Sequence, residues 1–215
     1  MSAVTQRSYA DGCGAARAMD VVGERWALLV VRELVFGPKR FRDLRAGLGA
    51  ISQNVLSQRL RELEASGVVR RERLGPPTGT EAYALTERGR QLEPTLIALS
   101  RWGAGLPGEH GPEMSTDAFM LLLKALHLPS PDALRVHLVV GADSFDVDVR
   151  PTGVTVTRGA SGPVAATARA DVPTLWRLIF TDLTVASATA RGSLDATGDL
   201  AALERFFTLF GAPPA

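Results

Sequence analysis

The sequence is short of cysteine, aromatic residues and long apolar runs, and these shortages exclude several classes of protein. Cys13 is the only cysteine, so no disulfide can form within the chain. No apolar stretch is long enough to span a bilayer, and residues 1–7 lack the apolar core of a signal peptide. We therefore expect a cytoplasmic protein with no membrane partner.

Catalytic and metal-binding patterns are also missing. His110 falls in a breaker-rich stretch, and His127 and His137 have no acid or cysteine at metal-ligand spacing, so both are interpreted as ordinary structural or surface histidines. There is no phosphate-binding glycine motif and no nucleophile elbow. We expect no enzymatic activity, no catalytic residues, no metal and no cofactor.

The charge of the chain is divided unevenly between its two halves. Residues 1–106 carry 16 Lys and Arg against 11 Asp and Glu, whereas residues 107–215 carry 8 against 12. A basic first half and an acidic second half indicate two domains with different partners, and nucleic acid is the natural partner of the first.

Residues 51–67 have the pattern of a helix with two contrasting faces. Leu56, Leu60 and Leu63 form an apolar stripe, Ser52 is suited to cap the start of the helix, and Gly67 to end it. The opposite face is rich in amides and hydroxyls and nearly free of acids, which suits the edges of bases in a DNA major groove. The alternative is a polar surface helix of some other small domain.

The flanking residues favour the DNA-binding interpretation. Helices are predicted over about 14–22 and 25–36, followed by a Gly-Pro turn and a short basic helix over 39–45. After Gly67, an arginine-rich strand, a polar loop and a second strand over 81–85 predict a β-wing. Thr86 begins a further helix towards Trp102, in which Pro94 predicts a kink or a delayed start. A helix-turn-helix has this order: a short helix, a glycine-containing turn and then a polar-faced helix.

Several separated motifs in this half resemble the HxlR family of bacterial winged-helix transcription regulators. They are Cys13, Val21-Val22-Gly23-Glu24-Arg25-Trp26, residues 34–41, Ile51-Ser52, residues 56–64 and residues 83–89. The resemblance covers about residues 11–106. It implies a repressor that binds a near-palindromic double-stranded DNA operator as a homodimer, with dimer contacts from the first and last helices of the domain.

Carried onto this sequence, the resemblance implies three groups of DNA contacts. Specificity would come from groove-facing residues on the helix, and position from phosphate and wing contacts. The groove group is Ser52, Gln53, Asn54, Ser57, Gln58 and Arg61; the phosphate group is Lys39, Arg40 and Arg42; the wing group is Arg71, Arg73, Thr78 and Thr80. Arg59 points to the side of the helix and is expected to pair with Glu62 or Glu64 instead.

Cys13 has two interpretations. The resemblance includes members in which a cysteine near this position senses oxidants or electrophiles. A switch would then need a bond to the other subunit or a small-molecule adduct. Gly14 follows Cys13, and no basic residue adjoins it to favour the thiolate. The alternative is a small buried packing residue.

The second half predicts an α+β layer. A breaker-rich linker over 107–114 precedes an apolar helix that ends before Pro129. Alternating residues predict strands over 134–140, 145–150, 154–157, 165–170 and 189–197, which we interpret as a mainly antiparallel, five-stranded meander with one apolar face. Helices over 172–181 and 200–210 carry aromatic residues that would cover that face.

Residues 190–199, together with Leu203, Phe206 and the helix over 171–180, resemble the end of a sterol-carrier-protein-2-like domain. This resemblance covers about residues 115–213. It implies a cavity between sheet and helices that holds a lipid-like or aromatic molecule. The residues expected to line it are Phe119, Leu123, Trp176, Phe180 and Phe206. A solid core is the alternative.

Together these features predict a DNA-binding and dimerisation domain over 1–106, a linker over 107–114 and a sterol-carrier-like ligand-binding domain over 115–215. The protein would be a nucleoid-associated repressor that responds to a small apolar effector. Two alternatives stay open. One is a hydrophobic-ligand carrier whose winged helix serves as a dimerisation module, and the other is a redox-switched repressor that acts through Cys13.

Overall fold

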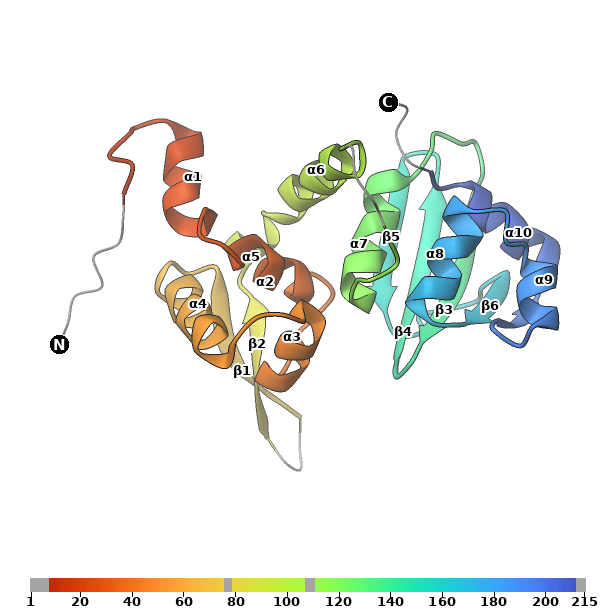
Figure 1. Cartoon of the computed structure of the whole chain (residues 1–215), viewed down its shortest axis with the longest axis horizontal. Coiled ribbons are helices and arrows are strands. Elements are labelled where there is room, and N and C mark those ends of the chain that lie inside the picture. The colour runs from red at the N-terminus through yellow and green to blue at the C-terminus, as the bar shows by residue number, and fades with distance from the viewer. Residues whose placement is uncertain (1–7, 76–78, 107–110, 212–215) are drawn as a thin grey trace. The chain divides into compact units, whose positions relative to one another are not determined.

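The computed structural model describes residues 8–75, 79–106 and 111–211, and it divides into two compact units. The first unit ends at Glu93 and the second begins at Pro94 (Figure 1). Helix α6 (Glu93–Ala104) counts with the second unit, whereas the sequence assigns it to the DNA-binding domain. The functional boundary therefore stays a prediction. In the described parts of the chain, no helix combines the length and apolarity needed to cross a bilayer.

The first unit has the predicted order of helices and strands. Its elements are α1 (Gly14–Val22), α2 (Ala27–Leu34), α3 (Phe41–Leu48), α4 (Gln53–Ala65), β1 (Val69–Leu74), β2 (Thr80–Leu85) and α5 (Glu87–Arg90). Helix α2 starts later than predicted because Trp26, just before it, has a left-handed backbone with φ of +78°. The helix predicted over 86–102 is split, since α5 ends at Arg90 and α6 begins one residue before Pro94. The delayed start that this proline predicts is confirmed.

Helix α4 begins and ends as the sequence predicts. The Ser52 hydroxyl accepts a hydrogen bond from the Val55 N–H, and Leu56, Leu60 and Leu63 are all buried in the core of the unit. At the other end Gly67 has φ of +69°, and the Val68 N–H donates to the Leu63 carbonyl at 2.9 Å. This left-handed stop turns the chain directly into the first strand of the wing.

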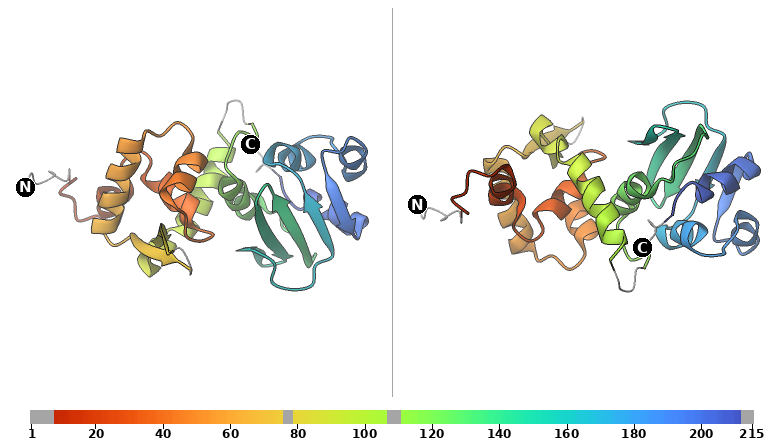
Figure 2. Two further views of the ribbon diagram at one scale, coloured as in Figure 1. Left: turned by 90° about the horizontal axis from the view of Figure 1, so that it is seen from below. Right: turned by 90° about the horizontal axis from the view of Figure 1, so that it is seen from above.

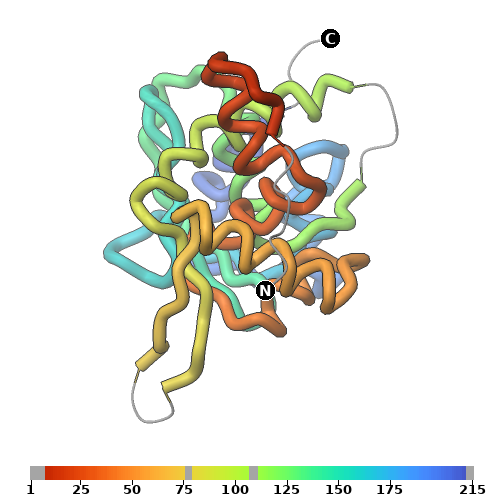
Figure 3. The backbone as a smooth tube through the Cα atoms, turned by 90° about the vertical axis from the view of Figure 1, so that its left-hand side faces the viewer, coloured from red at the N-terminus to blue at the C-terminus, as the bar shows by residue number. Residues whose placement is uncertain are grey.

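Strands β1 and β2 form the predicted antiparallel wing, with Val69 opposite Leu85 and Leu74 opposite Thr80. A short third segment joins it, because the backbone of Lys39 exchanges two hydrogen bonds with the backbone of Tyr83. The turn before α3 is thereby attached to the wing. Figure 3 shows the wing as a narrow hairpin that extends beyond the helices of its unit.

The second unit is an α+β layer, as predicted. Besides α6 it contains α7 (Thr116–Leu126), β3 (Leu134–Val140), β4 (Asp143–Arg150), β5 (Gly153–Arg158), β6 (Ala166–Arg169), α8 (Val172–Phe180), α9 (Val185–Ala190), β7 (Asp195–Gly198) and α10 (Leu200–Thr208). Figures 1 and 2 show α7, α8 and α10 on one face of the sheet. Side chains that point to that face, such as Val136, Leu138 and Val147, are buried.

The predicted meander is wrong, because the strand order is β5-β4-β3-β6-β7 and β6 runs parallel to β3. Alternation within a strand shows which face is buried but not which neighbour the strand pairs with, so the crossover left no trace in the pattern. The predicted strand over 189–197 is also shorter in the structure. Helix α9 continues to Ala190, and β7 begins only at Asp195.

Candidate nucleic-acid interface

The N-terminal half of α4 presents an exposed polar face. Gln53 and Asn54 are exposed and Ser57 is half-buried in the first turns of the helix, whereas Leu56 and Leu60 are buried. Within the described residues, the side chains of Gln53, Asn54 and Ser57 make no hydrogen bond. Their amide and hydroxyl groups are therefore available to an external partner.

The C-terminal half of α4 instead carries a chain of side-chain contacts, which we call the Gln58 relay. Arg61 donates to the Gln58 oxygen at 2.8 Å, and the Gln58 amide donates to Glu62 at 2.6 Å. Glu62 in turn binds Arg59, whose guanidinium also lies 3.6 Å from Glu24 in the α1–α2 connection. The predicted pairing of Arg59 with Glu62 is confirmed. Gln58 and Arg61, two predicted groove residues, thus already bind each other in the free protein.

The basic residues around α3 differ in their exposure and in the strength of their ion pairs within the unit. Arg42 exposes 76% of its side chain and lies 3.3 Å from Asp43, and Arg40 is the residue just before α3. Lys39 is only 14% exposed, and its ammonium lies 2.7 Å from the buried carboxylate of Glu33. A phosphate contact by Lys39 would have to share that ammonium with Glu33.

The wing arginines lie on the exposed side of the hairpin. Arg71 binds Glu64 of α4 and Glu81 of β2, each at 3.0 Å, and its guanidinium stacks over the Tyr83 ring. The hydrogen bond to Glu64 raises the pKa of Arg71 further. Arg73 is exposed and donates to the Gly79 carbonyl at 3.3 Å, and Thr80 lies opposite Leu74. Thr78, the remaining predicted wing contact, lies outside the described residues.

Cys13 is exposed, so its interpretation as a buried packing residue is wrong. It occupies the position just before α1, where its thiol faces the N–H groups of the first turn. The backbone N–H groups of Ala15 and Ala16 lower the pKa of the Cys13 thiol. The sequence offered no basic neighbour to favour the thiolate, but the start of the helix supplies the same effect.

In the second unit, the residues predicted to line a ligand cavity fall into two groups. Phe119, Leu123 and Phe206 are buried in the layer between sheet and helices. Trp176 and Phe180, one turn apart on α8, are half-buried, and their ring centroids are 5.0 Å apart.

His137 has an acidic partner that its spacing along the sequence did not indicate. On the face of the sheet opposite the apolar core, His137 of β3 lies directly across from Asp146 of β4, and its Nδ1 is 2.6 Å from the carboxylate. Asp146 is 2% exposed and also accepts hydrogen bonds from Arg135 and from the backbone and hydroxyl of Ser161. Spacing along the chain could not reveal this pair, because strand register brought together residues nine positions apart.

The Asp146 carboxylate is held ionised by its hydrogen bonds. Burial by itself raises the pKa of Asp146, but the bonds from His137, Ser161 and Arg135 outweigh that effect and lower the pKa to about 2. Because all four bonds join segments of the second unit, we interpret the cluster as a structural one.

A short helix, a turn, a polar-faced helix and a two-stranded wing, in this order and geometry, define a winged helix-turn-helix domain of the DNA-binding class. A family model described as HxlR-like helix-turn-helix matches residues 21–110. The chain is 40% identical over 86 residues to YvaP, an uncharacterized HTH-type transcriptional regulator of Bacillus subtilis, and this match covers 40% of the chain and 80% of YvaP. The chain belongs to the HxlR-like helix-turn-helix family of transcriptional regulators.

Two further similarities involve the same part of the chain. YybR, another uncharacterized HTH-type transcriptional regulator of Bacillus subtilis, is 38% identical, with 43% of this chain and 74% of YybR covered. The solved structure of the redox regulator HypR in its oxidized form is 36% identical and covers 45% of this chain and all of HypR, with a TM-score of 0.41. Each match spans less than half of the chain.

The Asp146 cluster predicts a pH-dependent contribution to the stability of the second unit. The folded pKa lies below the unfolded value, so the stabilisation is present above about pH 4 and is lost as the pH falls through about 2. Asp146→Asn should lower the free energy of unfolding by about 2 kcal/mol at pH 7 and by much less at pH 2. Denaturant unfolding across this range measures the difference, with the half-buried Asp148→Asn as control. A loss that is constant from pH 2 to 7 would contradict the assignment.

Proposed function

We propose that this regulator is a homodimeric repressor, working in the bacterial cytoplasm, that inserts the N-terminal half of α4 into the major groove of a near-palindromic operator. The observation that carries the proposal is the exposed face of Gln53, Asn54 and Ser57, whose hydrogen-bonding groups are unused within the described residues. Amides and hydroxyls of this kind can read base edges through paired donor and acceptor contacts.

The positioning contacts fall to the basic residues on either side of that helix. Arg40 and Arg42 at the start of α3 and Arg73 on the wing would meet phosphates, which fix the register without reading sequence. Ser52 caps the N-terminus of α4, and the backbone N–H groups at this end of the helix would also face the DNA. Gln58 and Arg61 would also read bases, once they exchange their bonds to each other and to Glu62 for bonds to base edges.

Substitution of a reading residue and of a phosphate residue should give different results. Asn54→Ala should cost about 1–3 kcal/mol on the preferred operator and relax base preference at one position, whereas Arg42→Ala should weaken binding to all sequences and reduce the salt slope by about 1. Operators selected from a random DNA library, ranked by anisotropy at several salt concentrations, provide the measurement. Arg169→Ala on the second unit is the charge-matched control.

If the chain showed no sequence preference and no steep loss of DNA affinity with salt, the alternative of a hydrophobic-ligand carrier with a winged helix used for dimerisation would be favoured instead. An unchanged ranking of operator variants after Asn54→Ala would mean that a different face of α4 enters the groove.

We further propose that the second unit binds a small apolar effector. Its support is the apolar layer between sheet and helices and the half-exposed pair of Trp176 and Phe180, which could admit a ligand at the edge of that layer. Phe119, Leu123 and Phe206 are buried, so a ligand would have to displace packed side chains to reach them. Regulation would follow if the effector bound the free and DNA-bound forms with different affinity.

A fluorescent 16-carbon fatty acid should bind the second unit, and Trp176→Ala should weaken its binding about tenfold through loss of ring contact. The measurement is a fluorescence titration of the full chain, with the exposed Trp102→Ala as the matched control. Equal binding to the Trp176→Ala and wild-type proteins would contradict an entry at α8.

A specific observation also supports a redox switch, since Cys13 is exposed and its thiol pKa is lowered. A lowered pKa increases the thiolate fraction, which is the form that reacts with oxidants and electrophiles. As the chain has a single cysteine, oxidation would join the Cys13 thiols of two subunits.

The redox proposal predicts that diamide releases the wild-type protein from its operator. Two Cys13 thiols would form one disulfide, with the two electrons and two protons passing to diamide. Cys13→Ser should stay bound and should give no covalent dimer on a non-reducing gel. Release of Cys13→Ser by diamide at the wild-type rate would eliminate this switch.

A further inference from the structure

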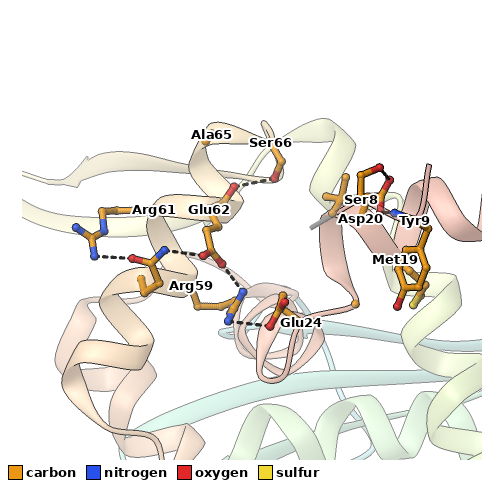
Figure 4. A pocket seen from close by; sticks show the side chains of 13 residues that line it. Ser8, Tyr9, Met19, Asp20, Glu24, Arg59, Arg61, Glu62, Ala65 and Ser66 are labelled. Atoms are coloured by element: carbon orange, nitrogen blue, oxygen red, sulfur yellow. Dashed lines mark hydrogen bonds and ion pairs between the residues drawn. The ribbon is translucent and has the colours of Figure 1, made fainter. Parts of the chain in front are cut away.

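The first unit contains an open cavity of about 820 Å³ on the side of α4 that carries the Gln58 relay. One wall is the C-terminal half of α4, and the other is formed by the residues before α1 together with α1 itself (Figure 4). Figure 4 shows Glu62, Arg59 and Glu24 on one side and Asp20, Tyr9 and Met19 on the other. All of these residues belong to the first unit.

The wall opposite α4 is both anchored and partly apolar. The Asp20 carboxylate accepts hydrogen bonds from the Ser8 hydroxyl and the Tyr9 N–H, each at 2.9 Å, which holds this segment against α1. The Tyr9 ring and the Met19 side chain are 67% and 42% exposed. An aromatic ring and a thioether are favourable surfaces for the flat part of a small molecule and, in the case of the ring, for a cation.

The described lining contains three carboxylates, Asp20, Glu24 and Glu62, and two guanidinium groups, Arg59 and Arg61. The Arg59 guanidinium lies between Glu62 and Glu24, and its side chain is only 11% exposed. Its buried Nε has no hydrogen-bond partner. Glu24 is 61% exposed and only 3.6 Å from Arg59, so its carboxylate can also accept a hydrogen bond from a molecule in the cavity.

We propose that this cavity is an effector site for a small organic cation, whose charged group binds Glu24 and whose apolar part packs on Tyr9 and Met19. An excess of carboxylates beside an exposed ring favours a cation over an anion or a neutral molecule. Within the described residues, no three acidic, histidine or cysteine side chains are placed to hold a metal ion, which favours an organic cation over an inorganic one.

The Gln58 relay connects this site to DNA reading. A cation at Glu24 competes with Arg59 for that carboxylate, so Arg59 is left to bind Glu62 alone, and Glu62 is the acceptor for the Gln58 amide. Arg59 and the Gln58 amide bind different oxygens of Glu62, so a firmer Arg59–Glu62 pair holds the acceptor of Gln58 in place. Gln58 and Arg61 then stay bound to their internal partners rather than turning to bases. This step rests on the proposed DNA-binding function. By linkage, the cation lowers operator affinity by the same factor by which the operator lowers cation affinity.

The test uses benzamidine as the cationic probe and its neutral near-isostere benzamide. With methyl-labelled methionine in the full chain, benzamidine should shift the Met19 signal in a saturable titration, and benzamide should not. Glu24→Gln should weaken benzamidine binding at least fivefold, whereas Glu87→Gln, an exposed glutamate outside the cavity lining, should leave it unchanged.

The proposal is overturned if benzamidine gives no saturable shift of the Met19 signal, which is the result expected if a second subunit fills the cavity. It is also overturned if the Glu24→Gln protein binds benzamidine as tightly as wild type does. Operator anisotropy gives the second readout. Saturating benzamidine should weaken operator binding at least threefold for wild type and for Glu87→Gln but not for Glu24→Gln. The Glu24→Gln protein also controls for any effect of benzamidine binding directly to the DNA. A saturable Met19 shift in a protein without operator preference would retain the site and reject the DNA-binding function. Normal operator binding without a Met19 shift would retain the DNA-binding function and reject the cation site.

Discussion

The buried carboxylate of Glu33 is the constraint on which the DNA-binding unit depends. Removing such a charge from water costs several kcal/mol unless it is paired, and here Arg32 and Lys39 bind it at 2.8 and 2.7 Å. A β-carbon on Gly47 would lie 2.2 Å from the same carboxylate, so any larger residue at this position of α3 would have to displace that carboxylate from its partners. The Lys39 backbone in turn pairs with Tyr83 of the wing. One charge on α2 thus fixes α3 and the wing, the two elements on either side of α4.

The two halves of α4 have different roles within that frame. The first half presents Gln53, Asn54 and Ser57 outward, with their hydrogen-bonding groups unused within the described residues. The second half binds inward through Gln58, Glu62 and Arg59 to the connection between α1 and α2. A helix divided in this way could combine base reading at one end with sensitivity to α1 at the other. Regulation would not then require the second unit to move the whole domain.

The second unit is organised around the two contrasting faces of its sheet. Its sheet has an apolar face under α7, α8 and α10 and a polar face on which Asp146 collects four hydrogen bonds. The polar cluster ties β3, β4 and the segment that contains Ser161, and it leaves the apolar layer as the place where an effector could enter. Because Phe119 and Phe206 are already buried there, binding would have to rearrange aromatic packing, and the half-exposed Trp176 and Phe180 are the side chains free to move first.

The sequence by itself determined the family, the order of elements in the first unit, the capped α4 with its apolar stripe, and the α+β class of the second unit. These features rest on local periodicity, turn residues and helix ends, which neighbouring residues dictate. Tertiary structure alone decided that β6 crosses to lie parallel to β3, that Asp146 meets His137, that Lys39 binds Glu33 and that Arg59 reaches Glu24. Each of these contacts joins residues that are distant in the chain or on different elements, and its partner is set by strand register, helix packing and the need to neutralise buried charge. No local pattern encodes that choice.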